Sequence, residues 1–160
     1  MNRSALFGII TIVGLVADQA TKLYIDASMR LYQSIPVVDN FFHITYLRNR
    51  GAAFSFLSNA TWRLPFFIGV SLVAAIAILV AFRKLAEEQR LAQVSLAMIF
   101  SGAVGNLIDR VRLGEVIDFL DVHWYRHHWP AFNVADSLIC VGVSLLALDM
   151  LLEDRRGKRA

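Results

Sequence analysis

The sequence predicts an all-α membrane protein with four transmembrane helices and a small extracytoplasmic β-sheet on the first outer loop. Three observations predict this class. Hydrophobic residues make up 57% of the 160-residue chain and the mean hydropathy is +0.54, which is too apolar for an ordinary soluble domain. Four apolar segments each have the length of about 20 residues that crosses the hydrocarbon core. One loop between them is rich in aromatic and β-branched residues.

The expected spans cover residues of about 4–25, 62–82, 91–111 and 132–152. The first is interpreted as a retained span because Asp18, Gln19 and Lys22 stand where a signal peptide would have a small-residue cleavage site. The length suffices for one compact domain, so residues 1–160 are taken as a single integral membrane domain.

Basic residues near the span ends predict the direction of each span. They are dense before the first span, between the second and third, and after the fourth: Arg3, Arg83, Lys84, Arg90, Arg155, Arg156, Lys158 and Arg159. Both termini are then cytoplasmic, and residues of about 26–61 and 112–131 form the outer loops. The net charge of +3 is attributed to this orientation and not to nucleic-acid binding, because the basic residues are scattered.

The two outer loops differ in composition. Phe41 to Tyr46 is rich in aromatic and β-branched residues and predicts a strand, with Asn49-Arg50-Gly51 as a turn, so a small sheet on the membrane surface is expected. The second loop contains Trp124, Tyr125 and Trp129 and is interpreted as an aromatic belt at the headgroup level.

Polar residues gather at one depth. Asp18 lies about 14 residues into the first span, roughly 21 Å at the rise of an α-helix. Asn106 lies late in the third span, and Asp136 lies about one turn into the fourth, entered from outside. Charge inside a membrane is costly and therefore marks function. The pattern predicts one site near the outer leaflet.

Asp118 and Asp136 are the candidate catalytic residues. Two neighbouring carboxyl groups share a proton, so that one acts as base toward water and the other as acid toward a leaving amine. The alternative for Asp136 is a helix-capping role with Asn133 as N-cap, and for Asp118 a solvated loop position.

Asp18 and Lys22 are spaced i, i+4 and share a helix face. An ion pair inside the bundle is the favoured interpretation. A general-base role of Lys22 toward Ser137 or Thr21 is the alternative.

The third span pairs Asn106 with Arg110 and Asp109 with Arg112 at helical spacing. Beside them lies a patch of small residues that permits close helix contact: Ser101, Gly102, Ala103 and Gly105. This pattern indicates a scaffold for a site. Snorkelling arginines are the alternative.

Metal chemistry is not expected. His123, His127 and His128 offer one i, i+4 pair if helical, but there is no His-Glu-x-x-His motif. Cys140 is the single cysteine and lies in apolar sequence, where a thiolate is disfavoured.

Several blocks together resemble the prolipoprotein signal peptidases (signal peptidase II), bacterial aspartyl proteases of the inner membrane. The blocks are Asp18-Gln19-Ala20-Thr21-Lys22, Asn49-Arg50-Gly51-Ala52-Ala53-Phe54, Gly102 through Asn106 to Asp109-Arg110, Val116-Ile117-Asp118-Phe119 and Phe132-Asn133-Val134-Ala135-Asp136. They occur in order and span nearly the whole chain, which makes the resemblance specific.

The resemblance implies an endopeptidase that cleaves just before a cysteine carrying diacylglycerol, with Asp118 and Asp136 as catalytic residues. It implies substrate binding or site support for Asp18, Lys22, Asn49, Gly51, Asn106, Asp109, Arg110, Asn133 and Ala135. Expected partners are a lipidated prolipoprotein and membrane lipid, with no cofactor, metal, nucleic acid or obligate protein partner. Phe54, Phe56, Trp62 and the 124–129 aromatics are expected along the approach.

Three rival functions remain open. A proton-conducting transporter would use Asp18, Lys22, Asp109 and Asp136 as a relay across the membrane. A structural subunit would need neither catalytic aspartate. A serine protease would need Ser137 with Lys22 as base.

Overall fold

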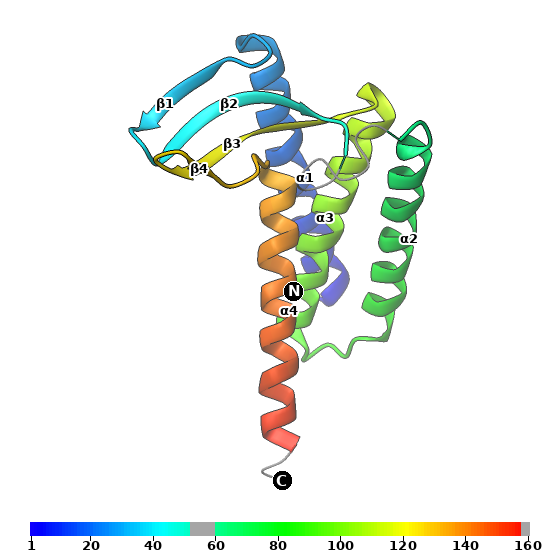
Figure 1. Ribbon diagram of the computed structural model, residues 1–160. Coiled ribbons are helices and arrows are strands. Elements are labelled where there is room, and N and C mark those ends of the chain that lie inside the picture. Colours follow the sequence, from blue (N-terminus) through cyan, green and yellow to red (C-terminus); the bar gives the residue numbers. More distant parts are fainter. Residues whose placement is uncertain (52–59, 158–160) are drawn as a thin grey trace.

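The computed structural model describes residues 1–51 and 60–157, with side chains described as far as Leu152. Its helices are α1 (Arg3–Ser28), α2 (Arg63–Lys84), α3 (Arg90–Leu113) and α4 (Val134–Gly157). Each of these four is long and apolar enough to cross a membrane, which confirms the predicted fold class. The helices run along one another, and a sheet lies across one end of them (Figure 1).

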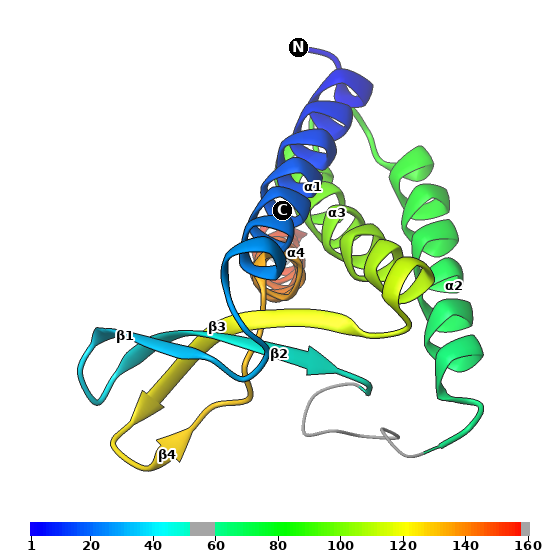
Figure 2. The same ribbon diagram turned by 90° about the horizontal axis from the view of Figure 1, so that it is seen from above.

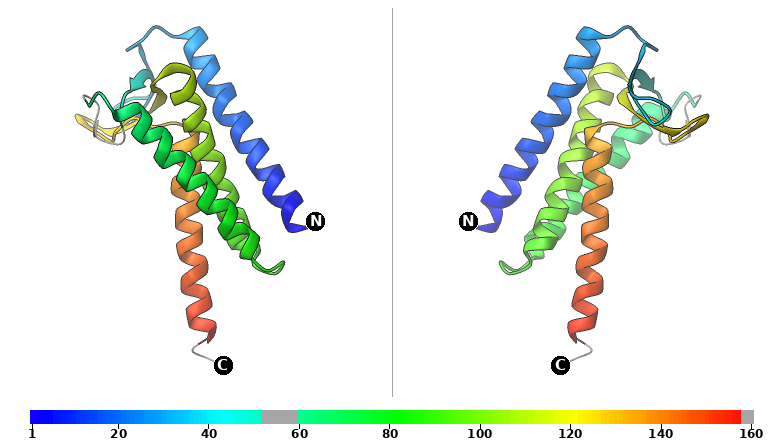
Figure 3. Two further views of the ribbon diagram at one scale, coloured as in Figure 1. Left: turned by 90° about the vertical axis from the view of Figure 1, so that its right-hand side faces the viewer. Right: turned by 90° about the vertical axis from the view of Figure 1, so that its left-hand side faces the viewer.

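Helix α3 is the centre of the bundle. It packs against each of the other three helices, and seen from above it lies between α2 on one side and α1 with α4 on the other (Figure 2). Half of its most apolar stretch is buried, whereas most of the corresponding stretch of α2 is exposed. The exposed face of α2 includes Val73, Ile76 and Val80, side chains suited to contact with lipid. Viewed from the side, the helices diverge away from the sheet (Figure 3).

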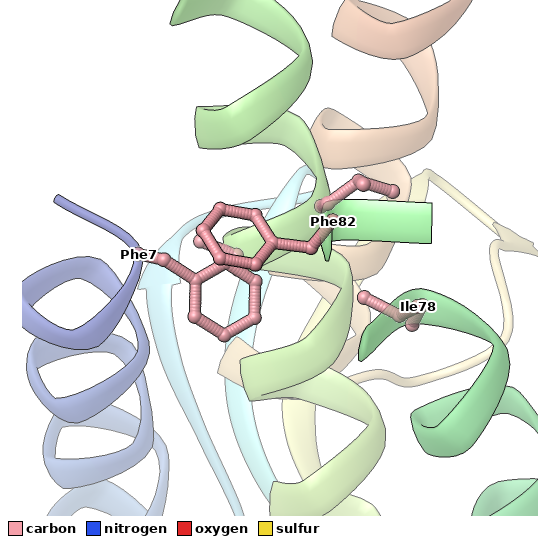
Figure 4. Close-up of a cluster of buried hydrophobic side chains, with 5 residues drawn as sticks. Phe7, Ile78 and Phe82 are labelled. Atoms are coloured by element: carbon pink, nitrogen blue, oxygen red, sulfur yellow. The ribbon is translucent and has the colours of Figure 1, made fainter. Parts of the chain in front are cut away.

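An apolar cluster joins α1, α2 and α3 at the end opposite the sheet. The rings of Phe7 and Phe82 lie 4.3 Å apart between centroids, and Ile78, Leu96 and Ala97 complete the buried cluster (Figure 4). Aromatic pairs in this arrangement add to the stabilisation from buried area. The cluster contains no titratable group, so this end of the bundle is a packing core.

The sheet is built from both outer loops. Its four antiparallel strands are β1 (Ser34–Val38), β2 (Phe42–Asn49), β3 (Val116–Trp124) and β4 (His127–His128), in that spatial order. The strand predicted over 41–46 falls largely within β2, which continues to Asn49. The second outer loop, interpreted from sequence as an aromatic belt, supplies β3 and β4, which the sequence analysis did not predict.

A β-bulge brings Asp118 beside the end of β2. Ile44 pairs with Leu120 and Leu47 with Asp118, so β2 has one extra residue at this point. Bulges bend a strand locally and are frequent next to active sites. Tyr46, within the bulge, packs with Ile25 in a second buried cluster, which attaches the sheet to α1.

Candidate active site

Asp118 and Asp136 reach one cavity from two different elements. Asp118 lies in β3 and Asp136 in the first turn of α4, and both line a cavity of about 480 Å³. Asp118 is only 3% exposed, so its interpretation as a solvated loop residue is wrong. The remaining wall of the cavity is largely apolar and includes Phe67, Val70 and Ile139.

Two amide side chains hold the Asp118 carboxyl group. Asn49 Nδ2 donates to Oδ2 at 2.9 Å, and Asn133 Nδ2 donates to Oδ1 at 2.7 Å. Burial, and after it the negative charge of Asp136, raises the pKa of Asp118 to about 7, against the lowering effect of the two amide hydrogen bonds. Near neutral pH this carboxyl group therefore exists in both protonated and ionised forms.

Asp136 belongs to a capping box. Its backbone N–H donates to Asn133 Oδ1 at 2.9 Å, and the Asn133 N–H donates to Asp136 Oδ2 at 3.3 Å. The capping interpretation is therefore correct, but it does not remove Asp136 from the cavity. The second carboxylate oxygen, Oδ1, accepts from Asn106 Nδ2 at 2.8 Å.

Asn133 connects the two carboxyl groups. Its side chain is fully buried, with Nδ2 bonded to Asp118 and also within 3.1 Å of Ile117 O and 3.3 Å of Asn106 Oδ1. Its Oδ1 accepts from the Asp136 backbone. One side chain thus fixes β3 and the start of α4 relative to each other.

A buried ionic cluster lies beside the carboxyl pair. Asp18, Lys22 and Asp109 are each 0% exposed, and Lys22 Nζ is 2.9 Å from Asp18 Oδ2, Asp109 Oδ2 and Asn106 Oδ1. An ammonium group has three N–H donors, and these three oxygens use all of them. The expected Asp18–Lys22 ion pair therefore exists, and Asp109 is part of it instead of pairing with Arg112.

The same cluster holds the backbone that precedes each aspartate of the pair. Asp18 Oδ1 accepts from the Ala135 N–H at 2.8 Å, and Asp109 Oδ2 accepts from the Ile117 N–H at 3.2 Å. Ala135 itself is fully buried and contributes this backbone group. Sequence reasoning gave no role to Gln19, whose Nε2 lies 3.0 Å from Asp18 Oδ2 and 3.2 Å from Asp109 Oδ1.

The alternative roles of Lys22 are not supported by the geometry. Ser137 Oγ donates to Asn133 O at 2.9 Å, and Thr21 Oγ1 donates to Ala17 O at 2.7 Å. Lys22 is committed to two carboxylates and one amide oxygen. No serine–lysine pair is formed among these residues.

Arg110, Asn49 and Gly51 also line the cavity. Arg110 Nη2 lies 3.4 Å from Gly51 O, and its guanidinium is 5.0 Å from the centre of the Phe67 ring. Asn49 Oδ1 accepts from the Gly51 N–H at 2.9 Å, consistent with the predicted turn. The motif residues Ala52, Ala53 and Phe54, and Phe56 with them, lie outside the described residues.

Two glycines of α3 permit the close contacts around the ionic cluster. A Cβ atom at Gly102 would lie 2.3 Å from Ala135 O, and one at Gly105 would lie 2.5 Å from Asp18 Oδ2. Both distances are too short for any side chain. The small-residue stretch predicted from sequence is thus the surface on which the start of α4 and the charged part of α1 rest.

Four helices of the protein are suited to cross a membrane, and at their sheet end two carboxyl groups are held by amide side chains. These two features are typical of an integral membrane enzyme. Comparison with known proteins narrows this class. A model of signal peptidase (SPase) II matches residues 10–152, and the chain belongs to this family of peptidases.

The family includes relatives that match over nearly their whole length. The lipoprotein signal peptidase of Geobacter metallireducens is 70% identical over 151 residues, which cover 94% of this chain and 93% of the relative. That of Geobacter sulfurreducens is 68% identical over 151 residues, with 94% of each chain covered. A solved bacterial membrane enzyme, determined by the in meso method at 2.3 Å resolution, superposes with a TM-score of 0.85 at 37% identity, covering 95% of this chain and 90% of that one.

Proposed function

We propose that this protein is a lipoprotein signal peptidase that uses Asp118 and Asp136 to activate water. The reaction is cleavage of a diacylglyceryl-modified prolipoprotein just before its lipidated cysteine. One observation carries the proposal: two carboxyl groups face a single, largely apolar cavity, and burial raises the pKa of Asp118 to about 7. The names of the relatives supply the substrate class.

The pair performs general acid–base catalysis. Asp118, with its raised pKa, enters the reaction protonated, and Asp136 accepts a proton from the attacking water. The tetrahedral centre then collapses as the acid donates its proton to the departing amine. Because the proton is shared, the apparent pKa values belong to the pair.

The apolar wall fits a substrate that remains partly in lipid. Phe67, Val70 and Ala74 of α2 face the cavity, while Asn49, Asn106 and Arg110 provide polar groups near the two aspartates. Acyl chains and the signal helix would contact the former, and the peptide backbone would bond to the latter. Positions at the cavity surface are assigned to substrate binding, and the fully buried Asp18, Lys22, Asp109, Asn133 and Ala135 to site support.

The same arrangement supports a proposed location for the protein. We place the protein in the bacterial inner membrane with both termini cytoplasmic and the sheet on the outer side, so that the cavity opens at the outer leaflet. A lipidated cysteine at the headgroup level would then reach Asp118 without leaving its acyl environment. The protein needs only substrate and lipid as partners.

A proton pathway is the competing function from another class. Such a pathway requires titratable groups at several depths. In the part of the chain with described side chains, the buried ionisable residues are Asp18, Lys22, Tyr46, Asp109, Asp118 and His123, all toward the sheet. The opposite end is the apolar cluster of Phe7 and Phe82. This distribution favours a single site over a path.

The test is cleavage of a lipidated prolipoprotein by purified protein, comparing wild type with Asp118→Asn and Asp136→Asn. Asn keeps the size of the side chain but cannot exchange the proton, so each variant is expected to lose roughly 10²–10⁴-fold in kcat. Asp39→Asn, an exposed change of the same type, is the matched control and should cut normally. An unlipidated substrate should not be cut.

Retained activity in both folded Asn variants would disprove the dyad. Ser137→Ala distinguishes the aspartate mechanism from the serine-protease alternative, because only a mechanism with Ser137 as nucleophile would make this variant inactive. Thermal unfolding of each variant in detergent establishes that a loss of activity is not a loss of fold.

A further inference from the structure

A second group of chemically competent side chains lies on the sheet, outside the cavity. It consists of His43 in β2 and of Asp121 and His123 in β3. His43 and Asp121 are direct cross-strand partners, and Asp121 and His123 are two residues apart, so all three side chains project from the same face. One potential ligand atom from each lies within 4.8 Å of the others. Such spacing fits donors around a single ion.

His123 has an unused ring nitrogen inside this group. The residue is 5% exposed, and its Nδ1 atom has no hydrogen-bond partner. The nearest carboxylate oxygen, Asp121 Oδ1, is 3.8 Å away, beyond hydrogen-bond distance. A buried polar atom without a partner destabilises the folded state, because it has lost its hydrogen bonds to water. A bound cation would satisfy this atom and would shield the carboxylate.

The neighbours of the group orient its ligand atoms. Ser34 Oγ lies 3.2 Å from His43 Nδ1, which leaves Nε2 free for another partner. His128 Nδ1 lies 2.9 Å from Asp121 Oδ1 and fixes that carboxylate. Metal-binding histidines and carboxylates typically have such outer hydrogen bonds, which set tautomer and direction.

We propose that His43, Asp121 and His123 form a binding site for Zn²⁺. Two imidazole nitrogens and one carboxylate oxygen are a typical donor set for this ion, with a water molecule as the fourth ligand. The ion would join β2 to β3 and stabilise the sheet against separation of the two outer loops. This inference is independent of the proposed peptidase reaction.

The site is separate from the carboxyl pair. Asp121 follows Asp118 by three residues on β3, so their side chains project from opposite faces, with Cα atoms roughly 10 Å apart at the rise of a strand. The ion therefore has no part in the cleavage step. The proposed site differs from the histidines considered from sequence, which were His123, His127 and His128. His127 is not a ligand because it pairs with Trp124 and is exposed on the opposite face of β4 from His128.

The experiment measures Zn²⁺ binding to the full chain in detergent, purified without a polyhistidine tag and stripped with chelator. Isothermal titration is expected to show one ion per wild-type chain and a rise in Tm on addition of Zn²⁺. His43→Gln and His123→Gln should each weaken binding by at least the ~10–100-fold that follows loss of an outer-shell partner. His127→Gln, the adjacent histidine outside the group, should bind as wild type does.

Two outcomes would overturn the site. Wild-type protein that takes up no Zn²⁺ refutes it regardless of how the variants fold. Equal binding by wild type, His43→Gln and His123→Gln, with each variant shown to be folded by a cooperative thermal unfolding transition, assigns the ion elsewhere. The Asp118→Asn variant tests whether the ion binds at the catalytic pair instead. The proposed site predicts that this variant binds Zn²⁺ as wild type does, whereas an ion at the catalytic pair would bind it more weakly.

Discussion

Replacement of Lys22 by Met tests whether the ionic cluster is a support for the site or part of its chemistry. Lys22 is 0% exposed and satisfies three oxygens at 2.9 Å, two of which belong to carboxylates that are themselves fully buried. Met has a similar length and no charge. The substitution therefore leaves Asp18 and Asp109 buried without their cation.

The magnitude follows from this loss of compensation. Removal of one partner from a buried ion pair costs about 3–5 kcal/mol, because the remaining charge stays desolvated. For a chain of this size that corresponds to a fall in Tm of roughly 6–20 °C. Cleavage should fall as well, because Lys22 holds Asn106 Oδ1 while Asn106 Nδ2 holds Asp136.

The assay is thermal unfolding in detergent, with cleavage of lipidated substrate measured on the same preparations. Lys84→Met, at the exposed end of α2, is the matched control and should shift Tm little. Combining Lys22→Met with Asp109→Asn should recover part of the lost stability, since one uncompensated charge is removed. A Lys22→Met protein that unfolds within about 2 °C of wild type, less than 1 kcal/mol, would refute the reasoning.

Two further predictions concern pH and packing. The pKa of Asp118 is about 7 in the folded protein against an ordinary 3.8, so its contribution to stability is full below pH 3.8 and is lost as pH rises to 7. We expect kcat/KM of cleavage to decline as pH rises through 7, because Asp118 then loses the proton it donates. A kcat/KM profile that stays flat to pH 9 would contradict the acid role of Asp118. Gly105→Ala would bring Cβ to 2.5 Å from Asp18 Oδ2, so unfolding measurements should show a loss of about 1–3 kcal/mol, whereas Gly8→Ala, which meets nothing within 4 Å, should not destabilise.

Much of the helical part of the structure could be predicted because lipid imposes a simple rule. Each span must be a continuous apolar stretch, so hydropathy alone identified four membrane-crossing helices. Helical periodicity also predicted that Asp18 and Lys22 would pair. The inclusion of Asp109 could not be predicted, because it depends on how closely α1 approaches α3, which glycine packing determines.

The strands of the second outer loop were not predicted, for a physical reason. Val116 to Trp124 contains β-branched and aromatic residues, which favour a strand, but tryptophans beside a span also suit an interfacial belt. Composition alone does not separate these interpretations. The pairing of His43 with Asp121 could not be predicted from the sequence, because it depends on the register between two loops that lie far apart in the chain.

The choice of amides around the carboxyl pair has a consequence for its chemistry. Among the residues with described side chains, three asparagines donate side-chain hydrogen bonds to the two aspartates: Asn49, Asn106 and Asn133. An arginine or lysine in their place would favour ionisation of both carboxyl groups and would prevent them from sharing a proton. The fully buried Lys22 contacts Asn106 Oδ1, and the amide nitrogen of Asn106 contacts Asp136. Asn106 therefore connects a rigid charged support to the reactive pair without neutralising it directly, so the ionic cluster can fix the geometry while burial determines the protonation of Asp118.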